Sequence, residues 1–251
     1  MEQPILYEEN ETYGTLYLNR PTKHNAVSIE MAKMMNNQLM ELKEKEISFL
    51  LIKAKGKKSF CSGGDLHDFH GKLSEEGINE QLQIMRDVLT QLIMFPVPTI
   101  CLLQGSAFGG GCELATACDI RIAKEGTKFG FVQANLGILP GWGGGAILSE
   151  KVNSSFALQW ILEGNTYDAQ FLLEKGWLHH VIVEDNWVNE KQYLMPYKTK
   201  TLLQMRHLKS QFMESLQIPT LIEKMDKELA RCAELWGSER HQQQVDEFLK
   251  N

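Results

Sequence analysis

Apolar residues recur along this chain in two alternating patterns, which together predict a mixed α/β fold. Short runs of aliphatic and β-branched residues predict strands, whereas apolar residues spaced three and four apart predict amphipathic helices. The predicted strands are 15–19, 48–54, 99–104, 120–123 and 129–131. The predicted helices between them are 29–45, 75–95 and one that begins at Gly110. Strands that alternate with helices favour a mostly parallel sheet.

Beyond Leu148 the pattern changes to helices. We expect one short extended stretch at 179–183 and helices at 155–163, 168–174, 186–194, 198–214 and 219–249, the last with a break near Gly237. No Pro/Ser-rich linker separates this helical part from the α/β part, so we expect one continuous fold. Exposed apolar faces on such helices usually contact another subunit.

Composition and charge narrow the class of protein. With 251 residues, 43% of them hydrophobic and 23% charged, the chain is typical of a globular protein with ample core. A net charge of −6 argues against nucleic acid as a partner. The acidic N-terminus predicts neither a signal nor a transit peptide, and no apolar run predicts a membrane span. The five cysteines include no CxxC pair, so we expect reduced thiols in a cytoplasmic protein without a metal site.

The stretch 99–145 holds the most telling chemistry. A buried strand leads into three consecutive glycines that open a helix carrying Glu113 on its first turn, and a second glycine-rich helix start follows at 141–145. Backbone N–H groups at a helix N-terminus lack intrahelical partners and can hold negative charge. Acyl chemistry through an enolate or oxyanion requires such donors. We therefore expect both helix starts to hold developing negative charge.

Four segments of the chain carry a resemblance to a known family. They are RPTKHNA, SFCSGGDL, GSAFGGGCELATACDIRIA and FGFVQANLGILPGWGG. Together they resemble the enoyl-CoA hydratase/isomerase (crotonase) family across essentially the whole chain. The resemblance implies a crotonase-like ββα-spiral core, residues 1–195, and a helical C-terminal trimerisation region, residues 196–251. It also implies an acyl-CoA thioester substrate, a homotrimer or a dimer of trimers, and no cofactor, because coenzyme A is part of the substrate.

The resemblance also assigns roles to individual residues. It implies an oxyanion hole made by the backbone N–H groups of Gly64 and Gly110, and it makes Glu113 one of two acid/base glutamates. Glycine suits the hole because it lets the backbone approach a thioester closely. The implied substrate-binding residues are Lys23, Ser62, Asp65, Leu66, His67 and Trp142.

Gln133 departs from the family pattern. It stands four residues before Gly137, where the family's second glutamate is expected. A glutamine amide can form hydrogen bonds but cannot exchange a proton near neutral pH. The site therefore lacks one of the two carboxylates that water addition uses. The isomerase interpretation is weakened too, because the family's isomerases place their proton-shuttling carboxylate at this position.

Decarboxylation of a malonyl-type thioester fits one glutamate, one glutamine and an oxyanion hole. That reaction needs a stabilised enolate and a proton donor but no base, and a second carboxylate would repel the carboxylate of the substrate. The segment FVQANLGILPGWGG is also similar to the ethylmalonyl/methylmalonyl-CoA decarboxylase branch. Two alternatives stay open: an enoyl-CoA hydratase or isomerase, and a non-catalytic acyl-CoA-binding homologue.

Other polar residues have two interpretations each. His67, Asp68 and His70 could form a metal or acid/base cluster, but their spacing also suits a solvated helix face, and we predict no metal. The pair His179 and His180 is expected to be structural. Lysines near the segments that hold CoA phosphates in relatives could do so here or be merely solvated; these are Lys23, Lys55, Lys57 and Lys58. The Trp142 ring is expected either to wall the acyl pocket or to pack in the core.

Overall fold

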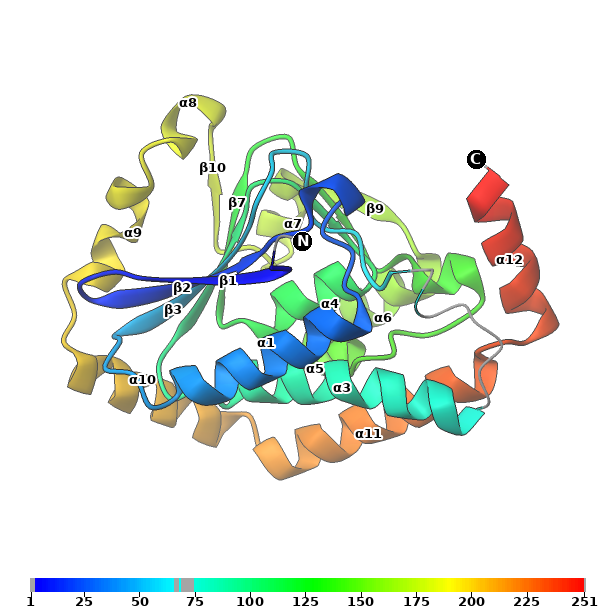
Figure 1. The fold of residues 1–251 in the computed structure, drawn as a ribbon. Helices are drawn as coiled ribbons and strands as arrows, with labels where there is room; N and C mark the ends of the chain where they lie inside the picture. Colours follow the sequence, from blue (N-terminus) through cyan, green and yellow to red (C-terminus); the bar gives the residue numbers. More distant parts are fainter. Residues whose placement is uncertain (1–2, 66–67, 69–74, 251) are drawn as a thin grey trace.

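The larger of two sheets forms the centre of the fold. The computed structural model describes residues 3–65, 68 and 75–250, and Figure 1 shows their arrangement. The spatial strand order is β1-β2-β3-β5-β7-β10. The strands are β1 (Ile5–Glu9), β2 (Tyr13–Leu18), β3 (Phe49–Ala54), β5 (Thr99–Leu103), β7 (Ile120–Lys124) and β10 (His180–Ile182). All neighbours are parallel except β1 and β2, which confirms the predicted mostly parallel α/β fold.

A smaller sheet carries the glycine-rich segments. Its strands, in the order β4-β6-β8-β9, are β4 (Ser59–Cys61), β6 (Ser106–Phe108), β8 (Lys128–Gly130) and β9 (Thr166–Asp168). The first three are parallel, and β8 pairs with β9 antiparallel. Each strand has three residues, which is too short for an apolar alternation to stand out, and the sequence pattern predicted only β8.

Both faces of the larger sheet are covered. Successive side chains of a strand point to opposite faces, so Leu50 and Ile52 of β3 join the main core while Phe49 and Leu51 join a second, smaller one. The main core lies against α1 (Ile29–Leu42), α3 (Glu75–Ile93), α4 (Gly110–Ala117), α5 (Gly144–Lys151) and α11 (Ile218–Leu235). In Figure 1, α1, α3 and α11 run across the lower half of the molecule, and α11 packs on α3 and α5.

The second core lies under the helices that follow β10. They are α8 (Glu184–Trp187), α9 (Glu190–Lys198) and α10 (Leu202–Ser215), and Leu194 and Met205 provide the contacts. The single helix predicted at 186–194 is wrong, because the chain leaves helical geometry at Asn189. Asn189 donates its N–H to the Asn186 carbonyl in a turn, a conformation that asparagine favours.

Five further helices lie in the described part of the chain. They are η1 (Pro21–Lys23), η2 (Val132–Leu136), α6 (Ser154–Glu163), α7 (Ala169–Glu174) and α12 (Glu239–Lys250). The predicted break at Gly237 is confirmed, with φ of 76° at that residue. His241 of α12 contacts the Leu136 carbonyl oxygen through Nδ1 at 2.8 Å, which fixes α12 against η2. Among the described residues, no helix combines the length and apolar character needed to cross a membrane.

Candidate active site

Two parallel helices direct their N-termini toward one region of the molecule. Near the N-termini, the Glu113 side chain of α4 contacts the first residue of α5; near the C-termini, Lys151 of α5 donates hydrogen bonds to the last carbonyls of α4. Parallel helices place their positive dipole ends side by side. The two glycine-rich segments therefore come together in space as well as in sequence.

A cavity of about 650 Å³ opens in front of the α4 N-terminus. Its walls include Gly64, Gly110, Glu113, Gln133 and Trp142, which the sequence analysis singled out. Apolar side chains also line it, namely Leu82, Val132, Leu136, Ile138, Leu139 and Trp236. The lining thus combines a few polar groups with many apolar ones, as is usual for a small-molecule site.

Two of the sequence motifs, RPTKHNA and SFCSGGDL, are hydrogen-bonded to each other at one wall of the cavity. The Val27 N–H donates to the Gly63 carbonyl and the Asp65 N–H to the Val27 carbonyl, each at 2.8 Å. Arg20 forms an ion pair with Asp65 at 2.9 Å. The RPTKHNA loop therefore holds the segment that carries Gly64 in place. The ion pair between Arg20 and Asp65 stabilises this wall of the cavity.

Gly64 and Gly110 both line the cavity, and the segments that carry them lie next to each other. A Cβ added to Gly63 would lie 3.4 Å from the Gly110 nitrogen, so the two segments are in contact distance. Neither N–H donates to an acceptor among the described residues. The preceding Gly109 has φ of 53° and ψ of −121°, which essentially only glycine adopts. This geometry starts α4 with its N–H groups turned to the cavity.

Glu113 is buried, with 1% of its surface exposed, and its carboxylate is held by three donors. Oε2 accepts the N–H groups of Trp142 and Gly144, and Oε1 accepts Nε2 of Gln133, each at 2.9 Å. Burial raises the pKa of Glu113 from 4.5 to about 7, although the backbone amides and Gln133 act in the opposite direction. Desolvation therefore outweighs these hydrogen bonds, and the carboxyl can exchange a proton near neutral pH.

Gln133 lies on η2 with 7% of its surface exposed. Its Nε2 donates to Glu113, and its own Oε1 is buried without a donor among the described residues. A buried carbonyl oxygen without a donor carries a desolvation cost. The Oε1 atom of Gln133 is therefore a buried acceptor that no described donor uses.

Trp142 packs in the core and also lines the cavity. It is 4% exposed, and its ring lies directly on Gly110. A Cβ added to Gly110 would lie 2.3 Å from Cη2 and Cζ3 of the ring. Glycine at 110 is thus needed for this packing.

Replacing Gly110 with alanine is expected to lower the free energy of unfolding by about 1–3 kcal/mol, because the added methyl overlaps the Trp142 ring. Urea denaturation measures the change. A double variant with Trp142→Leu provides the control, because the smaller side chain removes the overlap. The two losses should then sum to more than the loss in the double variant; strictly additive losses would contradict the assigned contact.

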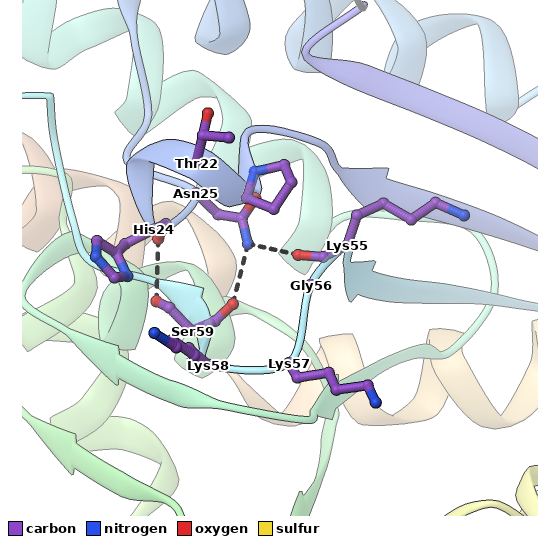
Figure 2. Close-up of a pocket in the computed structure, with 9 residues that line it drawn as sticks. Thr22, His24, Asn25, Lys55, Gly56, Lys57, Lys58 and Ser59 are labelled. Atoms are coloured by element: carbon purple, nitrogen blue, oxygen red, sulfur yellow. Dashed lines mark hydrogen bonds between the residues drawn. The ribbon is translucent and has the colours of Figure 1, made fainter.

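A second cavity, of about 470 Å³, adjoins the first around the RPTKHNA loop. Thr22 and His24 line both cavities. Figure 2 shows the buried Asn25 amide donating to the carbonyls of Lys55 and Ser59, at 3.0 and 2.9 Å. These bonds hold the turn that carries the basic residues of this cavity, Lys55, Lys57 and Lys58.

The other predicted residues lie in several places. Lys23 and Ser62 line the main cavity, whereas Leu66, His67 and His70 fall outside the described residues. Asp68 accepts the Ile29 N–H at 2.9 Å. Within the described part of the chain, no three His, Cys, Asp or Glu side chains are grouped to hold a metal ion.

The contacts of the two histidines near β10 indicate a structural role. His179 accepts the Arg121 N–H through Nδ1 at 3.1 Å, and burial together with the nearby Arg121 charge lowers its pKa to about 4. His180 is the first residue of β10 and pairs with Ile122 of β7. Neither of these histidines lines the main cavity.

Sequence reasoning missed a second carboxylate at the N-terminus of α5. Glu228 of α11 accepts the Gly145 N–H at 3.0 Å, on the same helix turn that binds Glu113. Burial and the charge on Glu113 hold the pKa of Glu228 well above its usual value. The second glycine-rich helix start therefore holds two carboxylates of the protein itself. No local motif marks Glu228, because only the packing of α11 brings it there.

The chain matches the family model of enoyl-CoA hydratase/isomerase over residues 8–251. It is 34% identical to mouse methylglutaconyl-CoA hydratase over 75% of this chain and 60% of that protein. It is 36% identical to chicken ethylmalonyl-CoA decarboxylase over 68% of this chain and 57% of that protein. The matched segment thus spans less than two thirds of either relative.

Solved structures show the same fold. An enoyl-CoA hydratase/isomerase from Xanthobacter autotrophicus Py2 superposes with a TM-score of 0.89 at 22% identity, covering all of this chain and 94% of that one. An enoyl-CoA hydratase from Bacillus halodurans gives 0.88 at 20% identity, covering 98% and 100%. The fold and the family model agree, and the chain belongs to the enoyl-CoA hydratase/isomerase (crotonase) family.

Proposed function

We propose that this protein decarboxylates a short malonyl-type CoA thioester through an enolate. The observation that carries the proposal is the hydrogen-bonded pair formed by the buried Glu113 carboxyl and the neutral Gln133 amide in the lining of the cavity. One carboxyl that exchanges a proton near neutral pH can serve as a proton donor. A glutamine beside it cannot serve as the second acid/base group that water addition uses.

The thioester oxygen binds between the Gly64 and Gly110 N–H groups. Both line the cavity and have no acceptor among the described residues. The positive end of the α4 dipole strengthens the Gly110 donor. Donors held in place before the reaction stabilise the negative charge of an enolate without reorganisation.

The apolar side chains of the cavity lining favour loss of the substrate carboxylate. A carboxylate among Leu82, Ile138 and Trp142 is poorly solvated, whereas carbon dioxide is neutral. The bond between the α-carbon and the carboxylate breaks, and its electron pair stays on the α-carbon as the thioester enolate. Negative charge thus moves from a carboxylate among apolar side chains to a thioester oxygen held by the two N–H donors.

Glu113 then protonates the α-carbon and regains a proton from solvent. The balance is one malonyl-type thioester and one proton giving one acyl-CoA and one carbon dioxide. A pKa of about 7 leaves a large share of Glu113 protonated at neutral pH. Gln133 adds no charge that would repel the substrate carboxylate.

The coenzyme A portion extends from the main cavity to the basic one. Lys55, Lys57 and Lys58 line the second cavity and supply positive charge for phosphates. Lys23 and Ser62 lie at the main cavity. Asp65 contributes by fixing the wall through Arg20.

The region 196–251 is proposed to form a homotrimer or a dimer of trimers. Apolar side chains on α10 are exposed in the single chain, namely Leu203, Leu208 and Phe212. Burying such side chains against another subunit is favourable. Light scattering tests this assignment, and a monomer would contradict it.

Hydration of an enoyl-CoA is the second candidate function, and the similarity to methylglutaconyl-CoA hydratase favours it. Purified protein is presented in parallel with crotonyl-CoA, methylmalonyl-CoA and ethylmalonyl-CoA, and loss of the enoyl chromophore and release of carbon dioxide are followed. We expect carbon dioxide from a malonyl-type thioester. Rapid hydration of crotonyl-CoA would refute the decarboxylase, and no turnover at all would leave a non-catalytic acyl-CoA-binding protein.

A further inference from the structure

Three apolar residues of the main cavity lie together at the C-terminal end of α11. They are Leu82, Leu139 and Trp236. The Cys232 thiol of α11 donates to the Leu139 carbonyl, with 3.2 Å between the two atoms. A Cβ added to Gly141 would lie 2.9 Å from the same sulfur and 3.1 Å from Cδ2 of Leu82. The Trp236 N–H donates to the Cys232 carbonyl at 3.1 Å, so Trp236 stands one helical turn after Cys232 on the same side of α11.

Polar residues of the lining belong to a different part of the cavity. Thr22 and His24 line both this cavity and the basic one, toward which the coenzyme A portion is proposed to extend. A thioester oxygen held by Gly64 and Gly110 then leaves the acyl group to face the rest of the lining. That part of the lining includes Trp236 and the apolar residues around it.

The Trp236 ring is held against a second helix that lines the cavity. It is partly buried, and its centroid lies 5.0 Å from that of the His241 ring. His241 is 1% exposed, and its Nδ1 donates to the Leu136 carbonyl oxygen at 2.8 Å. Leu136 ends η2 and itself lines the cavity. The indole is thus attached through His241 to the helix that carries Gln133.

The backbone after Trp236 also fixes the position of the ring. Gly237 has φ of 76° and ends α11, and Figure 1 shows α12 turning away from α11 at this point. The Ser238 hydroxyl accepts the His241 N–H at 3.2 Å at the start of α12. A Cβ added to Gly137 would lie 3.4 Å from the His241 nitrogen, so α12 is in close contact with the end of η2. Trp236 is therefore a fixed part of the wall.

We propose that Trp236 is a specificity-determining residue that limits the length of the acyl group. The ligand class is a CoA thioester with a short acyl group. The inference rests on the proposed function for the placement of the thioester, and it names the residue that makes the accepted acyl group short. A longer chain has to displace the indole from His241 and from the core residues that it packs against. Such a displacement is costly because protein interiors are close-packed.

Two saturated thioesters, butyryl-CoA and octanoyl-CoA, test the limit by calorimetry. Neither carries a carboxylate on the α-carbon or a double bond, so neither loses carbon dioxide or adds water. For the wild-type protein we expect butyryl-CoA to bind about tenfold or more tightly than octanoyl-CoA. In a pocket with room for the chain the order would be reversed, because each buried methylene raises the affinity by about fourfold.

Trp236→Ala removes the indole and is expected to tighten octanoyl-CoA binding by about tenfold or more, with little change for butyryl-CoA. Trp236→Phe keeps a ring against His241 and should give a smaller change in the same direction. Trp187→Ala is the matched control. Trp187 is also partly buried and stacks on a ring, that of Tyr193 at 5.6 Å, but it packs against the second core and is not among the described residues of the main cavity. This control should change neither affinity.

The outcomes separate this inference from the proposed reaction. Octanoyl-CoA binding as tight as that of butyryl-CoA in the wild-type protein overturns the inference without any variant. An unchanged ratio of the two affinities in folded Trp236→Ala also overturns it, as does an unchanged ratio in Trp236→Phe if the alanine variant fails to fold. An equal shift in Trp187→Ala contradicts the assignment to Trp236. Carbon dioxide release without a chain-length preference rejects this inference alone, whereas a preference set by Trp236 without carbon dioxide release rejects the proposed decarboxylation alone.

Discussion

Glu113→Gln is expected to lower the decarboxylation rate by about 10²–10⁴-fold, the usual contribution of a positioned proton donor. Thioester affinity should be retained, because the substituted side chain keeps the shape of the site. Its Oε1 can accept the Trp142 and Gly144 N–H groups that the Glu113 carboxylate accepts. Steady-state turnover and calorimetric binding of isobutyryl-CoA measure the two properties.

The same variant has a stability signature whose sign follows from the pKa of Glu113. In the folded state this pKa is raised from 4.5 to about 7, so the folded protein binds the proton more tightly than the unfolded chain does. The stabilisation is complete below pH 4.5 and is lost as the pH rises to 7, by about 3 kcal/mol in total. Glu113→Gln should lack this component in urea denaturation, and identical pH profiles would contradict the buried titration. Full turnover by Glu113→Gln would remove Glu113 from the mechanism.

Gln133→Glu is expected to convert the site from decarboxylation to hydration. A second carboxylate beside Glu113 supplies the acid/base group that water addition needs, so hydration of crotonyl-CoA should rise by about 10²-fold or more. Decarboxylation should fall, because the new carboxylate repels that of the substrate. Parallel assays of carbon dioxide release and enoyl absorbance follow both reactions.

Gln133→Met is the control for this conversion, since it removes the amide without adding a proton-exchanging group. It should lower decarboxylation and create no hydratase. If Gln133→Glu changes neither activity, the residue at this position does not determine the reaction.

The main elements of the fold could be predicted because their apolar residues repeat over many positions. In α1 the apolar spacing and the Ser28 N-cap gave the correct start, and the Ser28 hydroxyl accepts the Met31 N–H at 3.1 Å. Strand β1, whose sequence is ILYEE, was not predicted, since its two glutamates obscure the alternation. It is held by antiparallel pairing with β2, a contact that no local pattern reports.

The residues of the site could be located from motifs, but their electrostatics could not. Gly64, Gly110 and Glu113 lie in motifs, and the structure brings all three to one cavity. The raised pKa of Glu113 depends on its burial, which is a property of the folded chain. Glu228 was missed for a similar reason, because it reaches Gly145 only through packing of α11 against α5.

The most direct test of the central claim is the product formed from methylmalonyl-CoA in deuterium oxide. An enolate that is protonated after loss of carbon dioxide predicts propionyl-CoA with one deuterium at the α-carbon, together with one equivalent of carbon dioxide, detected by mass spectrometry. Recovery of unchanged methylmalonyl-CoA from a preparation that rapidly hydrates crotonyl-CoA would contradict the account.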